Sequence, residues 1–524
     1  MSNYHTILVG GGINNLVCAS LLAKSGKSVL LLERTEFLGG CIRSEELAGC
    51  IIDSLSTAYP LFVTSPAYAA LKEDLDKEGV EFVSTTTPTG TVLSNKSYAL
   101  ITTDKATNDK TYNGLFDGDG NRYRDQIAFI EQNADLLFSF LGKDLMTTSM
   151  ATYLAKYVWK NKIKNTTEKV GSFVANVRND FPRYYKGKEL QACLAPWILH
   201  TGLAPESPFS STMAKIIAFT VELVSLPLVK GGSYKIVDAF KNIIEKNGGQ
   251  ILLNQEVDEI LVDVDEKVKG VRTKDGKAFE SKNVVASVTP KQLYGNLLKS
   301  SAKVSNEVKN DAENYRFGMG NMQIHVVMNE EPKWYDEALS KVTYCHLSDG
   351  INDISKACIQ AKCQELPEQP TIAIGQPTAT DPTRAKDGKH VLWIQLPECP
   401  NFPVKDAAGQ LSHLCNGEWT EELKEAYADR VLERISQYIS NVKSACVARK
   451  VISPKDLSEL NINLVGGDPY AGLCEIEQYL VFRPLKSTKN HTTPIKNLYQ
   501  SGASTHPGPG LGGGSGFLIA QALK

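Results

Sequence analysis

The feature that most constrains this chain is residues 6–15, where an apolar segment leads directly into three consecutive glycines. The segment Ile7-Leu8-Val9 is typical of a buried strand, and the apolar residues after Asn15 have helical spacing as far as Gly26. A second apolar run then ends at Glu33. This order of strand, glycine turn, helix and strand predicts a βαβ nucleotide-binding unit rather than a plain structural turn.

Each position in this unit has a physical role. Gly10 lets the chain leave the strand sharply, and Gly12 lets the backbone come close to a pyrophosphate bound by the N–H groups of the helix start. Glu33 lies about twenty residues later, where a carboxylate accepts hydrogen bonds from ribose hydroxyls. Asn15 stands where such a unit normally has its third glycine, so we expect a looser contact between helix and strand there.

Composition narrows the class of protein. A chain of 524 residues exceeds what one hydrophobic core usually supports, so two interwoven domains are expected. The net charge of -2 and the lack of a Lys/Arg-rich block exclude a nucleic-acid partner. Because the first strand begins within a few residues of Met1, we expect no secretory signal and a cytoplasmic location. The eleven scattered cysteines indicate reduced thiols.

The most apolar stretch of the chain is residues 216–229, which contains Glu222 and Pro227 and is too short to span a bilayer. We predict that it forms buried core, with a monotopic membrane patch as the alternative. Peripheral membrane contact therefore stays open at this point, and the oligomeric state is unknown.

Further along the chain the pattern changes twice. Residues 122–225 are predicted to be mainly helical, and residues 250–287 alternate like an antiparallel meander. The domain boundaries expected from these changes form two discontinuous units. The nucleotide-binding domain is predicted to comprise 1–65, 226–295 and 451–524, and the substrate-binding domain 66–225 and 296–450.

The end of the chain is rich in glycine. His506 begins a His-Pro-Gly-Pro-Gly segment, and a glycine run over residues 512–516 precedes an apolar helix at 517–523. These glycines place unobstructed N–H groups at a helix N-terminus, which stabilises negative charge on a ligand. A reduced flavin carries such charge around its N1 and C2 carbonyl.

Four blocks of the sequence carry a family resemblance, in order along the chain. They are residues 10–16 with 33–34 and 39–40, residues 202–208 with 230–233, residues 249–287, and residues 466–516. With these blocks the chain resembles the bacterial-type phytoene desaturases, within the wider amine oxidase-like flavoprotein superfamily. The resemblance implies an α/β fold with a Rossmann-type FAD-binding domain, a βαβ unit with an antiparallel meander, interwoven with an α+β substrate-binding domain.

The resemblance also implies FAD as the cofactor, with its isoalloxazine over the helix start at residues 512–516. No second nucleotide fingerprint and no metal site are predicted. The residues implied to bind FAD are Gly10, Gly12, Asn14, Asn15, Glu33, Arg34, Gly39, Gly40, Val257, Gly502, Ala503, Gly512, Gly513, Gly514 and Ser515.

The function expected from these features is a desaturase, dehydrogenase or oxidase. A C–H of an apolar or partly apolar small-molecule substrate would pass as hydride to flavin N5, leaving a double bond. Aromatic residues between 150 and 200 are expected to line the pocket. His506 is the candidate catalytic acid or base, and a purely structural hydrogen bond to backbone is its alternative role.

Two other classes of function stay open. The first is a redox-neutral isomerase, or a saturase that uses reduced FAD and an external reductant. The second is a non-enzymatic binding protein on the same scaffold, such as the prenyl-GTPase escort proteins. Glu33 and the C-terminal glycine run argue against the second, because a scaffold without flavin would not need them.

Overall fold

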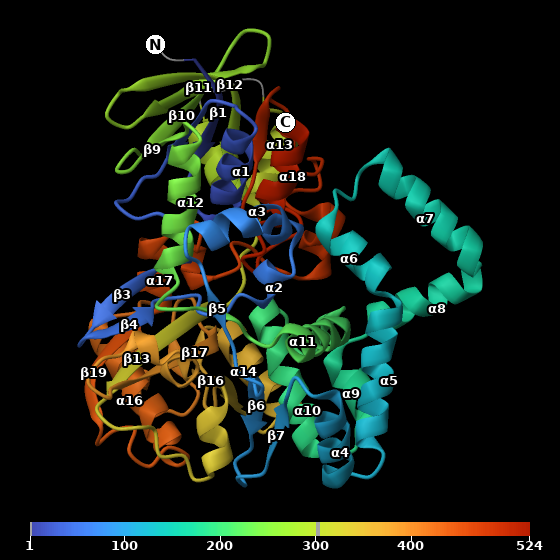
Figure 1. Cartoon of the computed structure of the whole chain (residues 1–524), viewed down its shortest axis with the longest axis vertical. Coiled ribbons are helices and arrows are strands. Elements are labelled where there is room, and N and C mark those ends of the chain that lie inside the picture. The colour runs from blue at the N-terminus through green and yellow to red at the C-terminus, as the bar shows by residue number, and fades with distance from the viewer. Residues whose placement is uncertain (1–2, 300–303) are drawn as a thin grey trace.

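The structure is a computed structural model that describes residues 3–299 and 304–524. In this described part, two seven-stranded sheets lie at opposite ends of the molecule (Figure 1). Strands of the first sheet come from residues 3–32, 250–286 and 498–500, so the chain passes repeatedly between the two sheets. The predicted fold class, an α/β Rossmann-type unit interwoven with a second α+β unit, is confirmed.

The first sheet has a parallel centre and an antiparallel edge. β12 pairs in parallel with β1, and its last residues pair in parallel with β20 on the other side. β10, β11 and β12 form the antiparallel meander that the sequence predicts. The strands are β1 (Asn3–Val9), β2 (Val29–Leu32), β9 (Gln250–Leu252), β10 (Val257–Val262), β11 (Val268–Thr273), β12 (Ala278–Ala286) and β20 (Leu498–Gln500).

Helices cover both faces of this sheet because successive side chains of its strands point to opposite sides. On one face, Leu8 and Leu31 pack against a first group of helices, which is named below. On the other face, Ile7 and Leu30 pack against a second, smaller group. The first group is α1 (Ile13–Lys24), α2 (Pro60–Val63), α3 (Pro66–Lys77), α12 (Tyr234–Lys246) and α18 (Gly514–Leu523); the second is η2 (Lys291–Leu297) and α13 (Asn306–Glu313).

This packing differs from the predicted division of the chain at two places. Residues 66–77 were expected in the substrate-binding part, but Leu71 and Leu75 of α3 lie in the hydrophobic cluster of the first sheet. Residues 306–313 were also expected there, but Val308 of α13 packs under the same sheet. The apolar stripes of these two helices face the Rossmann sheet, and the spacing of the stripes alone does not reveal which sheet they cover.

Helices α1 and α18 touch at Gly516. A Cβ at this position would lie 1.7 Å from the carbonyl oxygen of Asn14, so a side chain there forces the two helices apart. We expect Gly516→Ala to lower the free energy of unfolding by about 1–3 kcal/mol through overpacking. Chemical denaturation of the FAD-bound protein measures this change.

The matched control for that substitution is Gly171→Ala. Gly171 also lies in a helix, but an added Cβ meets nothing within 4 Å. There alanine should be neutral or stabilising by up to about 1 kcal/mol, the difference in helix propensity. Equal stability of Gly516→Ala and the wild type would contradict the close packing of α1 on α18.

The second sheet is mostly antiparallel, with one parallel pairing between β14 and β6. α16 (Glu421–Ser436) packs on it through Leu423, Tyr427 and Val431, which recur every four residues. The strands are β6 (Thr89–Val92), β7 (Tyr98–Ile101), β13 (Gly320–Met328), β14 (Tyr344–Leu347), β16 (Ile372–Gly375), β17 (His390–Cys399) and β19 (Cys446–Ile452). Shorter pairs are β3 (Ser44–Leu47) with β4 (Cys50–Asp53), β5 (Phe82–Val83) with β8 (Leu228–Val229), and β15 (Glu365–Leu366) with β18 (Lys405–Asp406).

Helices dominate residues 105–224, as predicted, although they begin earlier than residue 122. They are α4 (Lys105–Leu115), α5 (Asp119–Gln132), α6 (Ala134–Gly142), α7 (Thr148–Asn161), α8 (Ile163–Phe173), α9 (Val177–Tyr184), α10 (Lys188–Leu194), η1 (Ala195–Thr201) and α11 (Ser210–Val224). The remaining longer helices are α14 (Ile351–Lys362) and α17 (Pro454–Leu460). In the described ranges no helix is long and apolar enough to cross a bilayer.

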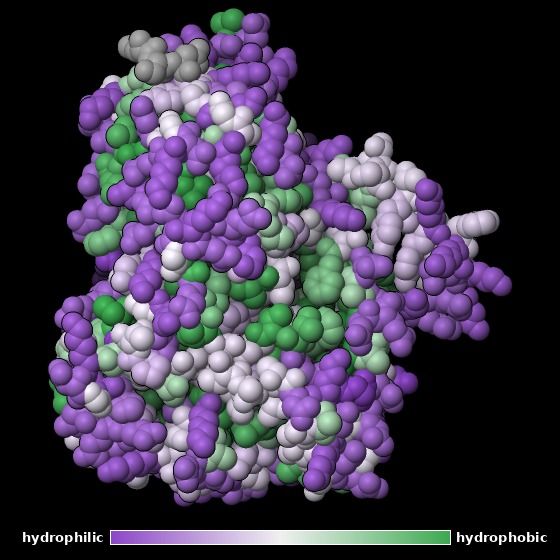
Figure 2. All heavy atoms as spheres, in the orientation of Figure 1, coloured by the Kyte–Doolittle hydropathy of each residue, from purple (hydrophilic) through white to green (hydrophobic). Residues whose placement is uncertain are grey.

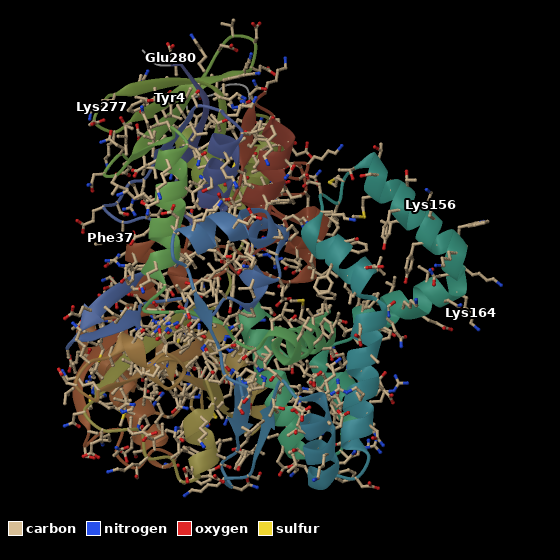
Figure 3. All side chains as sticks on the ribbon, viewed as in Figure 1. Tyr4, Phe37, Lys156, Lys164, Lys277 and Glu280 are labelled. Carbon is tan, nitrogen blue, oxygen red and sulfur yellow. The ribbon has the colours of Figure 1, made fainter. Side chains whose placement is uncertain are left out.

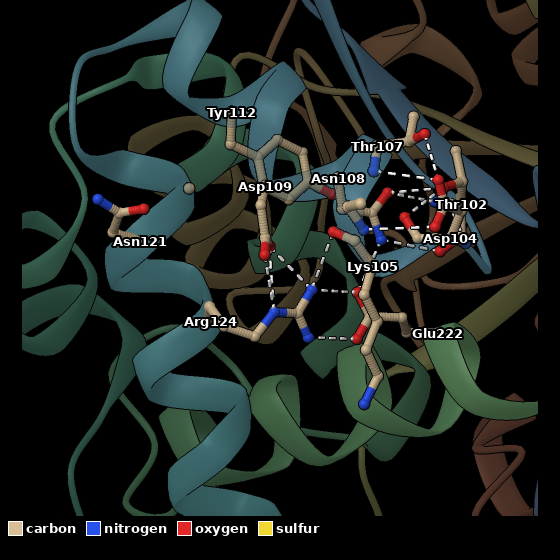
Figure 4. Close-up of polar contacts among 12 residues, drawn as sticks. Thr102, Asp104, Lys105, Thr107, Asn108, Asp109, Tyr112, Asn121, Arg124 and Glu222 are labelled. Atoms are coloured by element: carbon tan, nitrogen blue, oxygen red, sulfur yellow. Dashed lines mark hydrogen bonds and ion pairs between the residues drawn. The ribbon is translucent and has the colours of Figure 1, made fainter.

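The apolar stretch 216–229 forms the second half of α11, the turn after it and β8, and its side chains are largely buried, as the core prediction required. Glu222 in the middle of this stretch is buried too. Its carboxylate accepts hydrogen bonds from Arg124 (2.8 and 2.9 Å) and from the side-chain amide of Asn108 (2.7 Å) (Figure 4). Arg124 also contacts Asp109, so the buried charge is fully paired.

A second buried cation joins the two halves of the molecule. The guanidinium of Arg384 donates to Asp53 (2.6 Å), to Asp381 (3.2 Å) and to the carbonyl oxygen of Val229 (2.7 Å). The side chains of Arg384 and both aspartates are almost completely buried. The Ser233 N–H also donates to Asp53, so this cluster fixes the loop before α12 against β4.

Candidate functional site

The site begins where β1 ends. Gly10 has a φ of +92°, and a Cβ there would lie 3.4 Å from the carbonyl oxygen of Ser287 at the end of β12. α1 then starts with Gly12 at its N-cap, and no side chain caps it. The N–H groups of the first helical turn therefore have no side-chain acceptor there, as a helix start that binds a phosphate requires.

Glu33 lies at the end of β2, close to the same turn, and is 9% exposed. One carboxylate oxygen accepts from the Gly11 N–H (2.7 Å), and the other accepts from the Thr35 N–H (2.9 Å). The oxygen hydrogen-bonded to Thr35 also accepts from the Thr35 hydroxyl (3.0 Å), so the oxygen hydrogen-bonded to the Gly11 N–H is the one that keeps a further lone pair for a ligand. The carboxylate is thus held in one orientation at the edge of the sheet.

The second glycine pair packs directly on the first. The Gly39 N–H donates to the carbonyl oxygen of Gly11 (2.8 Å), and a Cβ at Gly40 would lie 3.2 Å from the Cα of Gly12. Backbone of residues 39–40 therefore lies against the start of α1.

The C-terminal glycines reach the same place from the other end of the chain. α18 begins at Gly514 after Gly513, which has a φ of +67° and gives no side-chain cap. The Gly516 N–H donates to the side-chain oxygen of Asn14 at 3.3 Å. Two helix N-termini, those of α1 and α18, are thereby brought together.

Asn15 does not produce the looser contact expected of it. Its side chain is fully buried, and its amide nitrogen donates to the carbonyl oxygens of Val9 and Gly10 (2.9 Å each). Its oxygen accepts from the hydroxyl of Ser501 (2.6 Å), next to β20. Asn15 therefore joins α1 to the ends of β1 and β20 by hydrogen bonds. A glycine at this position would instead let the helix and the strand approach closely.

A single cavity of about 1020 Å³ connects these elements with the second sheet. It is lined by most of the predicted cofactor residues, but Asn15, Ser515 and His506 are not among its lining residues. The predicted residues that line it are Gly10, Gly12, Asn14, Glu33, Arg34, Gly39, Gly40, Val257, Gly502, Ala503, Gly512, Gly513 and Gly514.

The cavity reaches the molecular surface among hydrophobic side chains. Leu61 of α2 and Phe138 of α6 both line it and are exposed to solvent. Figure 2 shows hydrophobic residues gathered between the upper and lower parts of the molecule, beside the base of the projecting helices. On this side the opening of the cavity is therefore mainly apolar.

Aromatic side chains line the far end of the cavity, at the second sheet. Tyr344 of β14 lies with its ring centroid 5.8 Å from Trp197 of η1 and 5.4 Å from Trp393 of β17. Of the aromatic residues expected between 150 and 200, Trp197 lines this wall, whereas Tyr153, Tyr157 and Trp159 of α7 are not lining residues. The wall is formed mainly by aromatic rings, which suits a partly apolar ligand.

His200 stands among these rings and forms a pair with His346. Their Nε2 atoms are 2.9 Å apart, so one ring donates a proton and the other accepts it. Burial lowers the pKa of His200 to about 4, and burial together with the neighbouring His200 lowers the pKa of His346 further. Both rings are therefore neutral near pH 7. Since Nε2 of His200 contacts His346, Nδ1 is the ring nitrogen of His200 that can contact a ligand.

Several cavity-lining residues carry polar atoms that have no partner. Within the described residues, these buried atoms are Nε1 of Trp197, both side-chain atoms of Asn321, Oε1 of Gln323 and, near Glu33, Oε1 of Gln255. A buried polar group without a partner is unfavourable by about 1–3 kcal/mol, so ligand or water must satisfy such groups. The far end of the cavity thus combines an apolar wall with polar groups that lack partners.

His506 does not have the catalytic position predicted for it. It is 2% exposed, it is not a lining residue of the cavity, and its Nε2 donates to the carbonyl oxygen of Lys143 (3.0 Å). Burial lowers its pKa to about 4. The structure favours the alternative, a backbone hydrogen bond that holds the glycine loop. Ser515 is likewise structural, with its hydroxyl 2.8 Å from that of Thr505.

Sequence reasoning missed the polar and aromatic residues supplied by the second sheet. These residues come from β13, β14 and β17, and the first and last of them are 74 positions apart: Asn321, Gln323, Tyr344, Trp393 and Gln395. Each of these residues lies in an apolar strand, and its position in that strand does not differ from that of an ordinary core residue. No local pattern marks them, because only the pairing of the strands brings them together.

A Rossmann sheet, two uncapped helix starts beside a buried carboxylate, and a cavity leading to a second sheet together define a dinucleotide-binding oxidoreductase. The residues present fit FAD, since the glycines leave room for a pyrophosphate and one oxygen of Glu33 keeps a lone pair for a ribose hydroxyl. The chain belongs to the family of flavin-containing amine oxidoreductases, whose family model matches residues 16–513. The protein is thus an FAD-dependent oxidoreductase.

Individual relatives are distant. The chain is 22% identical over 556 residues to rat "Pyridine nucleotide-disulfide oxidoreductase domain-containing protein 2", covering 99% of this chain and 93% of the relative. It is 27% identical over 330 residues to the lycopene-forming phytoene desaturase of a Paracoccus species, covering 62% and 60% of the two chains. A solved oxidoreductase from Methanosarcina mazei has the same fold, with a TM-score of 0.59, 16% identity, and coverage of 99% of this chain and 100% of the other.

Proposed function

We propose that the protein oxidises a C–H bond of a partly apolar small molecule and forms a double bond in it. The observation that carries this proposal is the continuous cavity, which runs from Glu33 and the glycine turns to the aromatic wall of the second sheet. When bound, FAD accepts the hydride of the substrate C–H bond. The relatives named phytoene desaturase support this class of reaction.

We assign the ends of the cofactor from the lining residues. The starts of α1 and α18 would hold its negatively charged groups, and Glu33 would bind the adenosine ribose. Arg34 and Val257 would lie toward the adenine, whereas Gly512, Gly513 and Gly514, next to the start of α1, would contact another part of the cofactor. Asn15 and Ser515 support this site without lining it.

The substrate would lie against the aromatic wall with a polar group near Asn321 and Gln323. Trp197, Tyr344 and Trp393 would bind its apolar part and exclude water. His200 would accept the proton that leaves with the hydride, at Nδ1, while His346 holds the ring through Nε2. The hydride and the proton together account for both hydrogens removed, and the substrate is oxidised by two electrons.

The test is the visible absorption of the purified protein, followed anaerobically with a panel of partly apolar alcohols, amines and terpenoid compounds. We expect the two bands of oxidised flavin to bleach with one compound, and His200→Gln to bleach more slowly at unchanged flavin content. His413→Gln is the control, because that histidine is exposed and is not a lining residue of the cavity.

The second candidate function is an isomerase or saturase that uses reduced FAD. Flavin bands that no compound bleaches, with turnover appearing only after chemical reduction of the flavin, would support it and contradict the desaturase proposal. A protein that binds no FAD even when the cofactor is added would contradict both. The cytoplasmic location expected from the sequence stays a prediction.

A further inference from the structure

Helices α7 and α8 form an arm with almost no hydrophobic core. Of the 14 residues in α7 only Met150 is buried, and none of the 11 residues in α8 is buried. The arm projects away from both sheets (Figure 1). Helices of this length are marginal in water unless one face is covered, so the arm lacks the packing that normally stabilises such elements.

Exposed apolar side chains lie at the tip of the arm and along α8. Trp159 is 87% exposed and Ile163 is 75% exposed, on either side of the turn between the two helices. Val170 and Val174, also exposed, follow Ile163 by seven and eleven residues, which puts all three on one face of the helix. An exposed apolar face that begins at a tryptophan indicates a surface that something else covers.

The same arm is strongly basic. Residues 148–173 contain one acidic residue, Glu168, and five lysines: Lys156, Lys160, Lys162, Lys164 and Lys169. Figure 3 places Lys156 and Lys164 on the arm, away from the body of the protein. Lysines interleaved with tryptophan and aliphatic residues are typical of helices that lie in a lipid–water interface.

The arm is also tied to the entrance of the cavity. At its base the Met146 N–H donates to the side-chain oxygen of Asn490 (3.2 Å), and His506 binds the carbonyl oxygen of Lys143 (3.0 Å). Lys143 and Phe138 both line the cavity. If the arm binds to a surface, the entrance of the cavity therefore lies close to that surface.

We propose that the arm docks the protein on a membrane surface that carries anionic lipids. Trp159 and Ile163 insert among the headgroups, and the lysines contact the lipid phosphates. The charge of the arm and its continuity with an apolar entrance favour a lipid surface over a protein partner. This site is distinct from residues 216–229, the segment that the sequence offered for membrane contact and that the structure buries.

The experiment is co-sedimentation of the FAD-bound protein with vesicles of phosphatidylcholine alone or mixed with phosphatidylglycerol. We expect binding to the mixed vesicles only. The triple variant Lys156→Gln, Lys160→Gln, Lys164→Gln should bind about a hundredfold more weakly, since one lysine near an anionic surface contributes about fivefold. The double variant Trp159→Ser, Ile163→Ser should lose about tenfold or more.

Matched controls come from the far edge of the first sheet. Val264 is 87% exposed, like Trp159, and Lys269, Lys274 and Lys277 are exposed lysines on the neighbouring strands and turn. Val264→Ser and the triple change of these lysines to glutamine should leave vesicle binding unchanged. Flavin absorption confirms that each variant is folded, and no substrate is needed.

Three results would overturn the proposal. The first is that the wild type does not sediment with anionic vesicles, or that the arm variants sediment as it does. The second is a dimer seen in sedimentation velocity that the tip variant abolishes, which would assign the arm to a second copy of the chain. The third is binding of soluble polyglutamate through the arm lysines without vesicle binding, which would assign it to an acidic protein.

Discussion

Replacing Arg384 with methionine is expected to destabilise the FAD-bound protein by about 3–5 kcal/mol, because it leaves two buried carboxylates without their cation. Asp53 and Asp381 both contact the guanidinium, and the side chains of all three residues are almost completely buried. The hydrogen bond to the Val229 carbonyl is lost as well. Thermal unfolding followed by circular dichroism measures the effect as a lower melting temperature.

Two further variants separate this explanation from a general effect of losing an arginine. Arg272→Met removes an exposed ion pair with Glu259 and should change stability by no more than about 1 kcal/mol. Adding Asp53→Asn to Arg384→Met removes one unpaired buried charge and should restore part of the loss. Wild-type melting of Arg384→Met would show that the buried cluster does not join the two halves of the molecule.

Replacing Glu33 with alanine is expected to weaken FAD binding about a hundredfold. The carboxylate would accept a charge-assisted hydrogen bond from a ribose hydroxyl, which contributes about 1.5–3 kcal/mol. The same change removes the acceptor of the Gly11 N–H, so the turn before α1 also loses its fixed position. Titration of the apoprotein with FAD, followed by quenching of flavin fluorescence, gives the dissociation constant.

The control for this variant is Glu36→Ala, which removes an exposed carboxylate three residues away. It should bind FAD as the wild type does. Glu33→Gln keeps the shape of the side chain but loses its charge and should fall between the two. Purification of Glu33→Ala with full flavin occupancy would refute the role given to this carboxylate.

The Rossmann part of the fold could be predicted because its signals are local. Gly10, Gly12 and Glu33 occupy fixed offsets between two strands, and the backbone geometry of a tight turn requires glycine at the first of them. The packing of α3 on the first sheet could not be predicted, for the opposite reason. Leu71 and Leu75 define an apolar face, but nothing in their spacing says which of two sheets that face covers.

The cofactor end of the site was predicted better than the substrate end. Most of the glycines named from the sequence line the cavity, because backbone that contacts a ligand must be glycine wherever a Cβ would collide. His506 was misassigned because its neighbours in sequence line the cavity while its own side chain is turned toward Lys143. His200 is placed beside His346 only by the packing of η1 on the second sheet.

The hydrogen bond between Asn15 and Ser501 has a consequence for how the chain is made. The two residues are 486 positions apart, and β20 and α18 are needed to complete the cofactor site. At a ribosomal rate of roughly 5–20 residues per second, Asn15 waits roughly 25–100 s for its partner. The complete cofactor site therefore forms only near the end of synthesis.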